Sequence, residues 1–200
     1  MLKAQAVKVL NNPKQIKALA DPLRREILRK LVEKPLTQSQ LAEELDASPS
    51  AIAYHLNLLS NLGLIRIQRT EIEEHGIQEK YYEPAARVFI EDYRSIPERD
   101  RKRLLQIHIE RVRGVLALIK YLKGVEYKEE DLYSRMKIEK IAEKIAENLT
   151  DIGYMYEKED VKLDRESLII KLYSKALEYT VNQKDEEELR GLIQGIKRSR

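Results

Sequence analysis

Three polar side chains recur on one side of a helix that the sequence predicts over residues 49–62. Ser50, Tyr54 and Asn57 are spaced by four and three residues, which places them on the same helical face. A helix that enters the major groove of DNA needs outward side chains of this kind, because they can hydrogen-bond to the edges of bases. Asn57 is the best candidate for sequence readout, since asparagine can pair with adenine through two hydrogen bonds.

The residues before this helix predict a second, shorter helix. Ser48 followed by Pro49 is an N-cap signal for the longer helix. Thr37 and Gln40 form a capping box that starts the shorter helix, which we expect over residues 38–45. Only three residues connect the two helices, so they must cross at a large angle.

The hydrophobic period then changes from that of a helix to that of strands. Residues 64–72 and 77–82 are rich in strand formers, and Gly76 between them can take the positive φ of a turn. Upstream, Asn12 and Asp21 are each followed by proline and predict the starts of two more helices. Helix, short helix, tight turn, helix and β-hairpin is the order of a winged helix-turn-helix.

Beyond Pro84 we expect helices to the end of the chain. Ser95 and Glu98 form a capping box for a helix over residues 96–123, and Gly124 is its expected C′ residue. Apolar residues in this helix follow a heptad pattern, which favours pairing with a second copy of the chain. The predicted dimerisation residues are Leu105, Ile109, Val112, Leu116 and Ile119.

The predicted fold class is therefore mainly α with a small β-hairpin. Residues 1–94 form the winged helix-turn-helix domain, and residues 95–200 form an all-helical domain for dimerisation and a candidate effector domain. Asp164 and Asp185 are expected N-caps of the last two helices, the second of which includes the apolar residues between 189 and 196.

The N-terminal part of the chain resembles the ArsR/SmtB-type winged-helix transcriptional regulators. The resemblance lies in the segments ALADPLRREILRKL and LTQSQLAEELDASPSAIAYHLNLLSNLGLI and in a hairpin that ends EKYY. It covers roughly residues 13–90, and the rest of the chain is similar to the helical extensions of archaeal members. The resemblance implies a homodimeric repressor that binds a palindromic double-stranded DNA operator and releases it on sensing a signal.

Positions carried over from the resemblance suggest how each residue would contact DNA. Ser48 would cap the recognition helix and could donate to a phosphate, while basic residues of the wing and of the preceding helix would meet the backbone. The full set of candidate DNA-binding residues is Ser48, Ser50, Tyr54, Asn57, Arg66, Arg69, Lys80, Arg24 and Arg25.

Several of these residues also have purely structural interpretations. Ser48 can serve as an N-cap alone. Arg24 and Arg25 can be solvated helix charges, and Arg69 and Lys80 can be cross-strand partners of acids on an exposed hairpin, namely Glu71 and Glu79.

The sequence predicts no metal site, no cofactor and no catalysis. Cysteine is absent, and His55, His75 and His108 do not lie at ligand spacing. Seven glycines leave little room for a phosphate-binding loop, and no catalytic arrangement of Ser, His and Asp is present. Seven of eleven tyrosines follow residue 100, and we favour core packing over a tyrosine-lined ligand cavity for them. Any small-molecule effector stays unknown.

The charge balance weakens the electrostatic argument for DNA binding. The chain has 37 Lys and Arg against 34 Asp and Glu, which leaves a net charge of +3. Residues 37–62 contain three acids, Glu43, Glu44 and Asp46, and no Lys or Arg. We therefore expect a weak monomer that depends on dimer avidity. A protein–protein interaction scaffold in transcription or chromosome machinery is the alternative function.

Composition also bears on where the protein works. Charged residues make up 36% of the chain, which is typical of the ion-pair-rich surface of a thermophile protein. We expect a cytoplasmic protein, because no stretch is apolar enough for a membrane span or for the core of a signal peptide.

Overall fold

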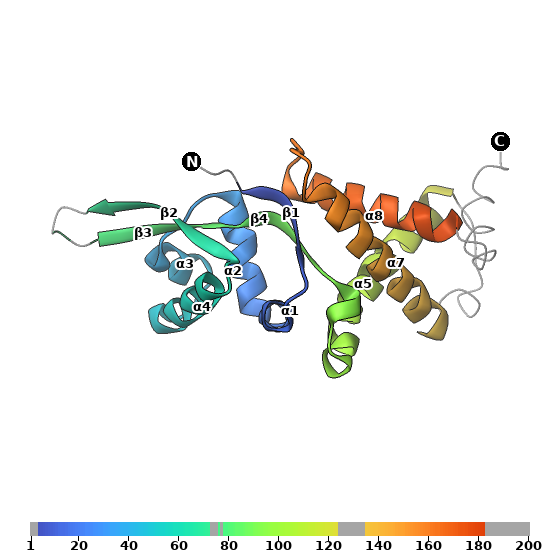
Figure 1. Cartoon of the computed structure of the whole chain (residues 1–200), viewed down its shortest axis with the longest axis horizontal. Helices are drawn as coiled ribbons and strands as arrows, with labels where there is room; N and C mark the ends of the chain where they lie inside the picture. The colour runs from blue at the N-terminus through green and yellow to red at the C-terminus, as the bar shows by residue number, and fades with distance from the viewer. Residues whose placement is uncertain (1–3, 73–75, 77, 124–134, 183–200) are drawn as a thin grey trace.

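The computed structural model describes residues 4–72, 76, 78–123 and 135–182. The chain is mainly helical with a small antiparallel hairpin, which confirms the predicted fold class (Figure 1). In chain order the elements are β1 (Gln5–Leu10), α1 (Pro13–Leu19), α2 (Pro22–Glu33), α3 (Gln38–Glu44), α4 (Pro49–Asn61), β2 (Ile65–Ile72), β3 (Gln78–Pro84), β4 (Ala86–Glu91), the 3₁₀ turn η1 (Tyr93–Ser95), α5 (Glu98–Lys123), α7 (Arg135–Tyr156) and α8 (Arg165–Asn182).

The helix starts that the sequence predicts are confirmed in the N-terminal half. Asn12, Asp21, Thr37 and Ser48 each accept a hydrogen bond from a backbone N–H in the first turn of the helix that follows. Thr37 and Gln40 bond reciprocally, as a capping box requires. Asp164 likewise accepts from the Ser167 N–H at the start of α8. The predicted N-cap Asp185, the apolar residues of 189–196 and Gly124 lie outside the described residues.

A parallel two-stranded ribbon is the main difference from the sequence-based expectation. β1 pairs with β4, with Val7 opposite Val88 and Val9 opposite Ile90. The prediction that the chain is helical beyond Pro84 is wrong for residues 86–91. The six-residue segment alternates between buried and half-buried positions, and pairing with β1 provides its backbone hydrogen bonds.

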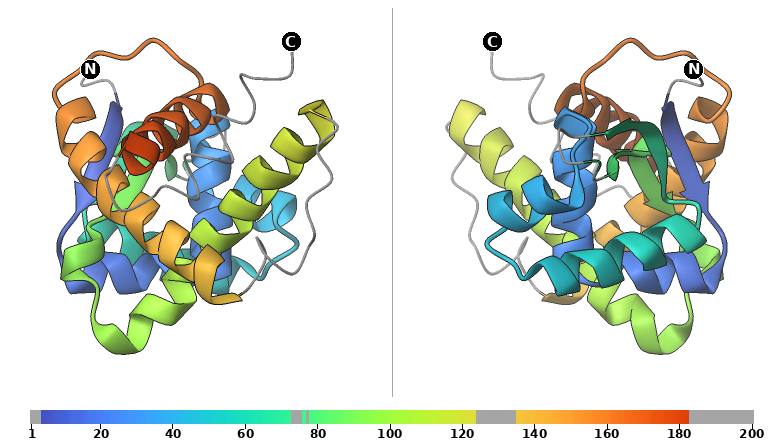
Figure 2. Two further views of the ribbon diagram at one scale, coloured as in Figure 1. Left: turned by 90° about the vertical axis from the view of Figure 1, so that its right-hand side faces the viewer. Right: turned by 90° about the vertical axis from the view of Figure 1, so that its left-hand side faces the viewer.

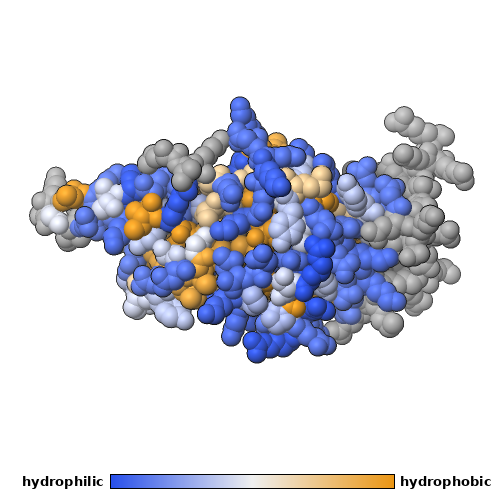
Figure 3. Space-filling model, viewed as in Figure 1, coloured by the Kyte–Doolittle hydropathy of each residue, from blue (hydrophilic) through white to orange (hydrophobic). Residues whose placement is uncertain are grey.

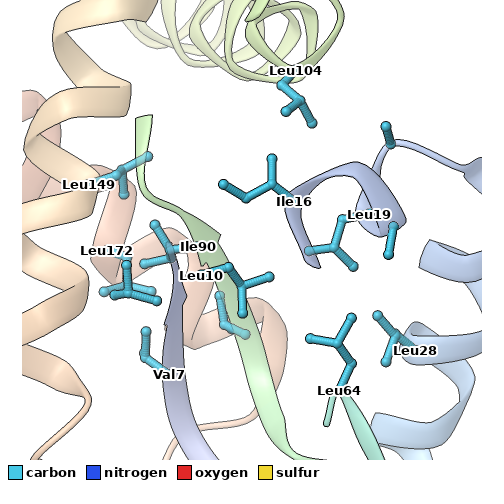
Figure 4. Packing of buried hydrophobic residues seen from close by; sticks show 14 of the residues in the cluster. Val7, Leu10, Ile16, Leu19, Leu28, Leu64, Ile90, Leu104, Leu149 and Leu172 are labelled. Atoms are coloured by element: carbon cyan, nitrogen blue, oxygen red, sulfur yellow. The ribbon is translucent and has the colours of Figure 1, made fainter. Parts of the chain in front are cut away.

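The ribbon lies in the middle of the molecule, with helices on both sides. Figure 4 shows α1 and α2 on one side of it and α7 and α8 on the other. Val7 and Leu10 of β1 are fully buried, and Ile90 of β4 is nearly so. One apolar cluster runs from the helix-turn-helix through the ribbon into the C-terminal helices. The division into domains at residue 94 stays a prediction, and this core crosses it.

The predicted capping box at Ser95 and Glu98 is wrong. The Ser95 hydroxyl donates to Asp92 Oδ2 at 2.9 Å, and Asp92 Oδ1 accepts from the Arg94 N–H at 3.1 Å. Asp92 therefore organises the 3₁₀ turn with the serine, and α5 begins three residues after that turn, behind Pro97. The Ser95 N–H, which Glu98 would accept from in a capping box, donates instead to the Asp92 carbonyl at 2.9 Å, so Ser95 belongs to the turn and not to the start of α5.

Three residues of the predicted heptad seam are covered by the chain itself. Leu105, Ile109 and Val112 are buried in the core, where α5 packs against α7. The side chains of Leu116 and Ile119 lie outside the described part. The seam therefore contributes to the fold of a single chain, and the homodimer stays a prediction.

Two glycines on different helices allow a test of how tightly the ribbon is packed. A Cβ at Gly153 of α7 would lie 2.8 Å from Val9 Cγ2 and 2.9 Å from Ile90 Cδ1, whereas a Cβ at Gly114 of α5 meets no atom within 4 Å. We expect Gly153→Ala to lower the free energy of unfolding by about 1 kcal/mol through overpacking. Gly114→Ala should raise it by about 1 kcal/mol, because alanine is the better helix former. Denaturant unfolding of both variants measures the difference, and equal stabilisation would contradict the packing described.

Candidate nucleic-acid interface

The turn between α3 and α4 determines how the recognition helix is presented. Asp46 has a φ of 47°, and it is the one non-glycine residue with positive φ in the described ranges. Aspartate adopts this left-handed conformation more readily than most residues. The next residue, Ala47, donates its N–H to the Ala42 carbonyl at 3.0 Å, and Gln38 Nε2 donates to the Pro49 carbonyl at 3.1 Å. The two helix starts are thereby held together.

α4 separates its residues cleanly into a buried and an exposed face. Ile52, Leu56 and Leu59 are buried to 1% exposure or less. On the opposite face, Asn57 is exposed and the exposed fraction of Tyr54 is 63%. In the right-hand view of Figure 2, α3 and α4 lie on the face of the molecule that is turned toward the viewer. The polar face of α4 is thus free to meet a partner.

The N-terminal end of α4 carries two serines. The Ser48 hydroxyl accepts from the Ala51 N–H at 3.2 Å, so its role as an N-cap is confirmed. Ser50 is exposed and its Oγ lies 3.1 Å from Ser48 Oγ. The two hydroxyls and the N-terminal turn of the helix lie beside one another.

The C-terminal end of α4 is held by side chains from the N-terminal segment. Gly63 follows the helix with a φ of +64°, which ends it in the conformation that glycine favours. Gln15 Nε2 donates to the Leu62 carbonyl at 2.8 Å, and Lys8 Nζ donates to the Gly63 carbonyl at 3.2 Å. These carbonyls have no partner within the helix, and a lysine beside them also suits the helix dipole. α4 is therefore anchored at both ends.

The hairpin is joined to the helix-turn-helix by a short bridge. Leu36, just before α3, exchanges two backbone hydrogen bonds with Tyr82 of β3, at 3.3 and 2.9 Å. The hairpin extends away from the body of the molecule (Figure 1), and Gly76 has the positive φ expected of its turn. Ile67 and Ile72 of β2 are exposed, and Figure 3 shows apolar residues on this otherwise mainly hydrophilic part of the surface.

Two of the three basic wing candidates are engaged within the hairpin. Arg66 Nε lies 2.6 Å from Glu83 Oε1 on the neighbouring strand. Arg69 Nε lies 2.6 Å from Glu71 Oε1 on its own strand, and its guanidinium stacks 3.7 Å from the centre of the Tyr81 ring. The structural interpretation of Arg69 thus applies, with Glu71 as a same-strand partner instead of a cross-strand one.

The third wing candidate is exposed. Lys80 stands opposite Thr70 on β2, and Glu71 of that strand pairs with Arg69. The predicted cross-strand ion pair of Lys80 therefore does not form. Within the described residues, no ion pair involves Lys80.

Arg24 and Arg25 contact the end of α1. Arg24 Nε donates to the Ala18 carbonyl at 2.5 Å, and Arg25 Nη1 donates to the Leu19 carbonyl at 2.9 Å. Both side chains are half-buried, so the interpretation as solvated helix charges is wrong. The two arginines thus bond to carbonyls of the last turn of α1, of which that of Ala18 also accepts from the Asp21 N–H at 3.4 Å.

The acidic residues of the motif are partly neutralised. Glu44 forms ion pairs with Lys30 at 2.9 Å and Lys34 at 3.0 Å, which join α2 to α3. The hydrogen bond from Lys30, followed by the one from Lys34, lowers the pKa of the Glu44 carboxyl. Glu43 and Asp46 remain as exposed acids beside the recognition helix.

The structure offers no ligand set for a metal in its described part. No group of three or more His, Asp or Glu residues there could hold an ion. His55 is half-buried beside Tyr54, and His108 is buried against Tyr173, while His75 lies outside the described residues. Among the described helices, none is long and apolar enough to cross a membrane.

Residues that anchor the recognition helix were missed in the sequence. Lys8, Gln15 and Gln38 act through contacts with residues distant in the chain, which local patterns do not reveal. Asp46 could have been identified, since an Asp in a three-residue connection between helices is a good candidate for positive φ.

Comparison with known proteins identifies the motif. Residues 21–66, which include α2, α3 and α4, match the family described as "Bacterial regulatory protein, arsR family". This description is that of a regulatory protein and not of an enzyme. No curated protein matches the chain.

Two solved structures of named proteins are similar to parts of the chain. Reduced HlyU from Vibrio cholerae N16961 is 30% identical over 36% of this chain and 70% of its own, with a TM-score of 0.31. A mutant of Lactococcus lactis ZitR in apo form is 20% identical over 61% of this chain and 81% of its own, with a TM-score of 0.30.

The two serines at the start of α4 should differ in their effect on stability. We expect Ser48→Ala to lower the free energy of unfolding by about 1 kcal/mol, because the Ala51 N–H loses its acceptor. Ser50→Ala removes an exposed hydroxyl and should change it by less than about 0.5 kcal/mol. Chemical denaturation measures both, and a Ser50→Ala effect as large as that of Ser48→Ala would show that the cap is not the stabilising contact.

Proposed function

From the arsR-family helix-turn-helix domain that residues 21–66 form, we propose that the chain is a transcriptional regulator that binds a specific double-stranded DNA operator. It acts as a homodimer and as a repressor in this proposal. α4 enters the major groove, and the hairpin of β2 and β3 contacts the backbone or the minor groove.

The observation that carries the proposal is the exposed polar face of a rigidly anchored helix. Tyr54 and Asn57 project from α4, whose apolar face is buried and whose two ends are tied to other elements. Side chains that read base edges must be presented in a fixed geometry, because a bidentate hydrogen bond tolerates little displacement. Ser48 and Ser50 at the N-terminal turn of α4 suit contact with a phosphate.

The basic residues contribute in different ways in this proposal. Lys80 is exposed and can contact a phosphate without losing an ion pair. Arg66 and Arg69 would have to exchange Glu83 and Glu71 for DNA, which reduces their net contribution. Arg24 and Arg25 would act mainly by holding α1 against α2, behind the recognition helix.

Dimerisation supplies the affinity that a single domain lacks. Two recognition helices on one operator raise the apparent affinity through effective concentration. The proposed contact lies on the helical half, where Leu118 and Tyr121 of α5 and Ile170 of α8 are exposed. The two half-sites are then expected about 10–10.5 base pairs apart, centre to centre.

One observation favours a protein–protein scaffold as the second candidate. α3 and α4 carry no lysine or arginine, and the hairpin exposes Ile67 and Ile72. A protein groove would accept such a surface more readily than a phosphate backbone would. Binding of the gene's own promoter fragment in the presence of competitor DNA separates the two functions. A regulator would bind the promoter fragment in preference to the competitor, whereas a scaffold would not discriminate between the two DNAs.

Replacement of Asn57 tests the recognition helix. We expect Asn57→Ala to weaken binding to the promoter fragment about tenfold or more and to relax the choice at one base pair, since a lost bidentate contact is worth about 1–3 kcal/mol. Fluorescence anisotropy with the promoter and with singly substituted fragments measures both effects. Asn182→Ala, at the exposed end of α8, is the matched control and should bind as the unmodified protein does. Unchanged affinity and footprint in Asn57→Ala would remove α4 from the interface.

The salt dependence of binding tests the small number of phosphate contacts. Each phosphate contact contributes about −0.9 to the slope of log K against log salt concentration. We expect the measured slope to be shallower than eight such contacts would give.

The exposed acid before α4 allows a second electrostatic test. Asp46→Asn should raise the affinity for DNA severalfold at low salt, because it removes an exposed negative charge next to α4 and asparagine tolerates the same φ. Glu178→Gln, exposed on α8, controls for net charge. A slope of eight phosphates or more, or an equal gain in the control, would contradict this electrostatic picture.

A further inference from the structure

A cavity of about 120 Å³ lies between the DNA-binding half and the C-terminal helices. Its walls come from α1, α2, β4, α5, α7 and α8. Apolar side chains form much of the lining, among them Leu28, Phe89, Ile107 and Leu172. At roughly 15 Å³ for each water-sized group, this volume accommodates a molecule of about eight non-hydrogen atoms.

Three arginines from three elements line the cavity, and each donates a hydrogen bond to a carbonyl or hydroxyl oxygen. Arg25 of α2 donates to a backbone carbonyl, Arg87 of β4 donates to the carbonyls of Val161 and Leu163, and Arg111 of α5 donates to the Tyr173 hydroxyl at 2.6 Å. Within the described residues, none of the three arginines forms an ion pair.

Two further arginines of the lining are already neutralised. Arg29 forms ion pairs with Glu26 and Glu33, and Arg165 with Glu166. Their charges are therefore matched by acids outside the cavity, and they add little to its surplus of positive charge.

The cavity contains one acid of its own among the described residues. Glu91 of β4 lines the same space. Desolvation raises the pKa of its carboxyl, while the charges of Arg111 and Arg25 have a smaller, opposing effect. A single acid cannot balance three guanidinium groups, even when it is fully ionised. The cavity therefore has a surplus of positive charge next to an apolar wall, which is an unfavourable arrangement without an anion.

A second observation points to a missing hydrogen-bond acceptor. Arg87 Nε is buried and has no hydrogen-bond partner in the described part of the chain. A buried N–H group without a partner is rare in proteins and is usually satisfied by a water or a ligand. The orphan donor belongs to a residue of the cavity wall.

The remaining polar groups form a fixed chain along one side of the cavity. Tyr173 accepts from Arg111 and so directs its own proton to His108 Nδ1, at 2.7 Å. Burial, with a smaller contribution from the charge of Arg111, lowers the pKa of His108 to about 4, so the imidazole is neutral at pH 7. Arg111 is thereby held in place while its remaining N–H groups are available to a ligand.

We propose that this cavity is a binding site for a small organic acid, with its carboxylate on Arg25, Arg87 and Arg111 and its apolar tail against the α2, α5 and α8 walls. Guanidinium groups match a carboxylate in geometry as well as charge. The volume restricts the ligand to a monocarboxylate with a short tail of about five carbons, because the carboxylate itself takes three of the roughly eight atoms. Because the lining includes α2 and the C-terminal helices α5, α7 and α8, an occupant contacts both halves of the chain at once.

Calorimetric titration of the full chain with straight-chain carboxylates tests the site. We expect sodium hexanoate to bind once per chain, and acetate and decanoate to bind at least tenfold more weakly, because the first lacks a tail and the second exceeds the volume. 1-Hexanol and hexylammonium, which have the same tail without the negative charge, should also bind at least tenfold more weakly. No DNA is present, so the result is independent of the proposed regulatory function.

Two substitutions and a matched control connect this binding to the arginines. Arg111→Gln and Arg25→Gln should each weaken hexanoate binding at least tenfold, since each removes a charge-assisted hydrogen bond. Arg113→Gln, on the exposed side of α5 next to Glu110, should leave it unchanged within twofold. Circular dichroism verifies that each variant is folded, and either cavity variant alone is sufficient for the test. Absence of saturable binding at millimolar hexanoate, equal binding of 1-hexanol, or an equal loss in Arg113→Gln would overturn the proposal.

Discussion

The rest of the fold depends on burial of the β1–β4 ribbon on both faces. Two parallel strands are not stable in water alone, and parallel pairs occur where helices cover both sides. Here α1 and α2 cover one face and α7 and α8 the other (Figure 4). A parallel pair also needs a long crossover connection, and in this chain the helix-turn-helix and the hairpin together form that connection. The ribbon therefore holds the DNA-binding elements and the C-terminal helices in one core.

Local chemistry explains how much of the fold could be predicted. Asn12, Asp21, Thr37 and Ser48 act within their own first helical turn, so the sequence around each is sufficient to identify the helix start. The ribbon depends instead on a partner strand about 80 residues away, and six-residue segments have too short a pattern to reveal it. The error at Ser95 has a related origin, because the turn that Asp92 organises uses both the N–H and the hydroxyl of Ser95, and the sequence alone does not show that this turn forms before α5.

The sequence was sufficient to predict which residues of the candidate interface face outward. It was not sufficient to predict the contacts that hold the interface in place. Helical periodicity places Tyr54 and Asn57 on the exposed face of α4, as the structure has them. The contacts of Arg24 and Arg25 with the end of α1 required the packing of two helices to be known. Basic residues near a recognition helix can thus serve the scaffold, and a count of positive charge overstates what is available to phosphates. The exposed polar surface and its rigid mounting are the stronger support for DNA binding.

The pairing of β1 with β4 also has a consequence for biosynthesis. β1 is translated about 80 residues before its partner, which is complete only when residue 91 has been translated. The helices and the hairpin between them can form in the meantime, because their contacts are local. The helices α7 and α8, which cover the second face of the ribbon, are translated later still. Docking of the N-terminal strand is therefore a late step of co-translational folding, and the nascent chain exposes an apolar edge until then.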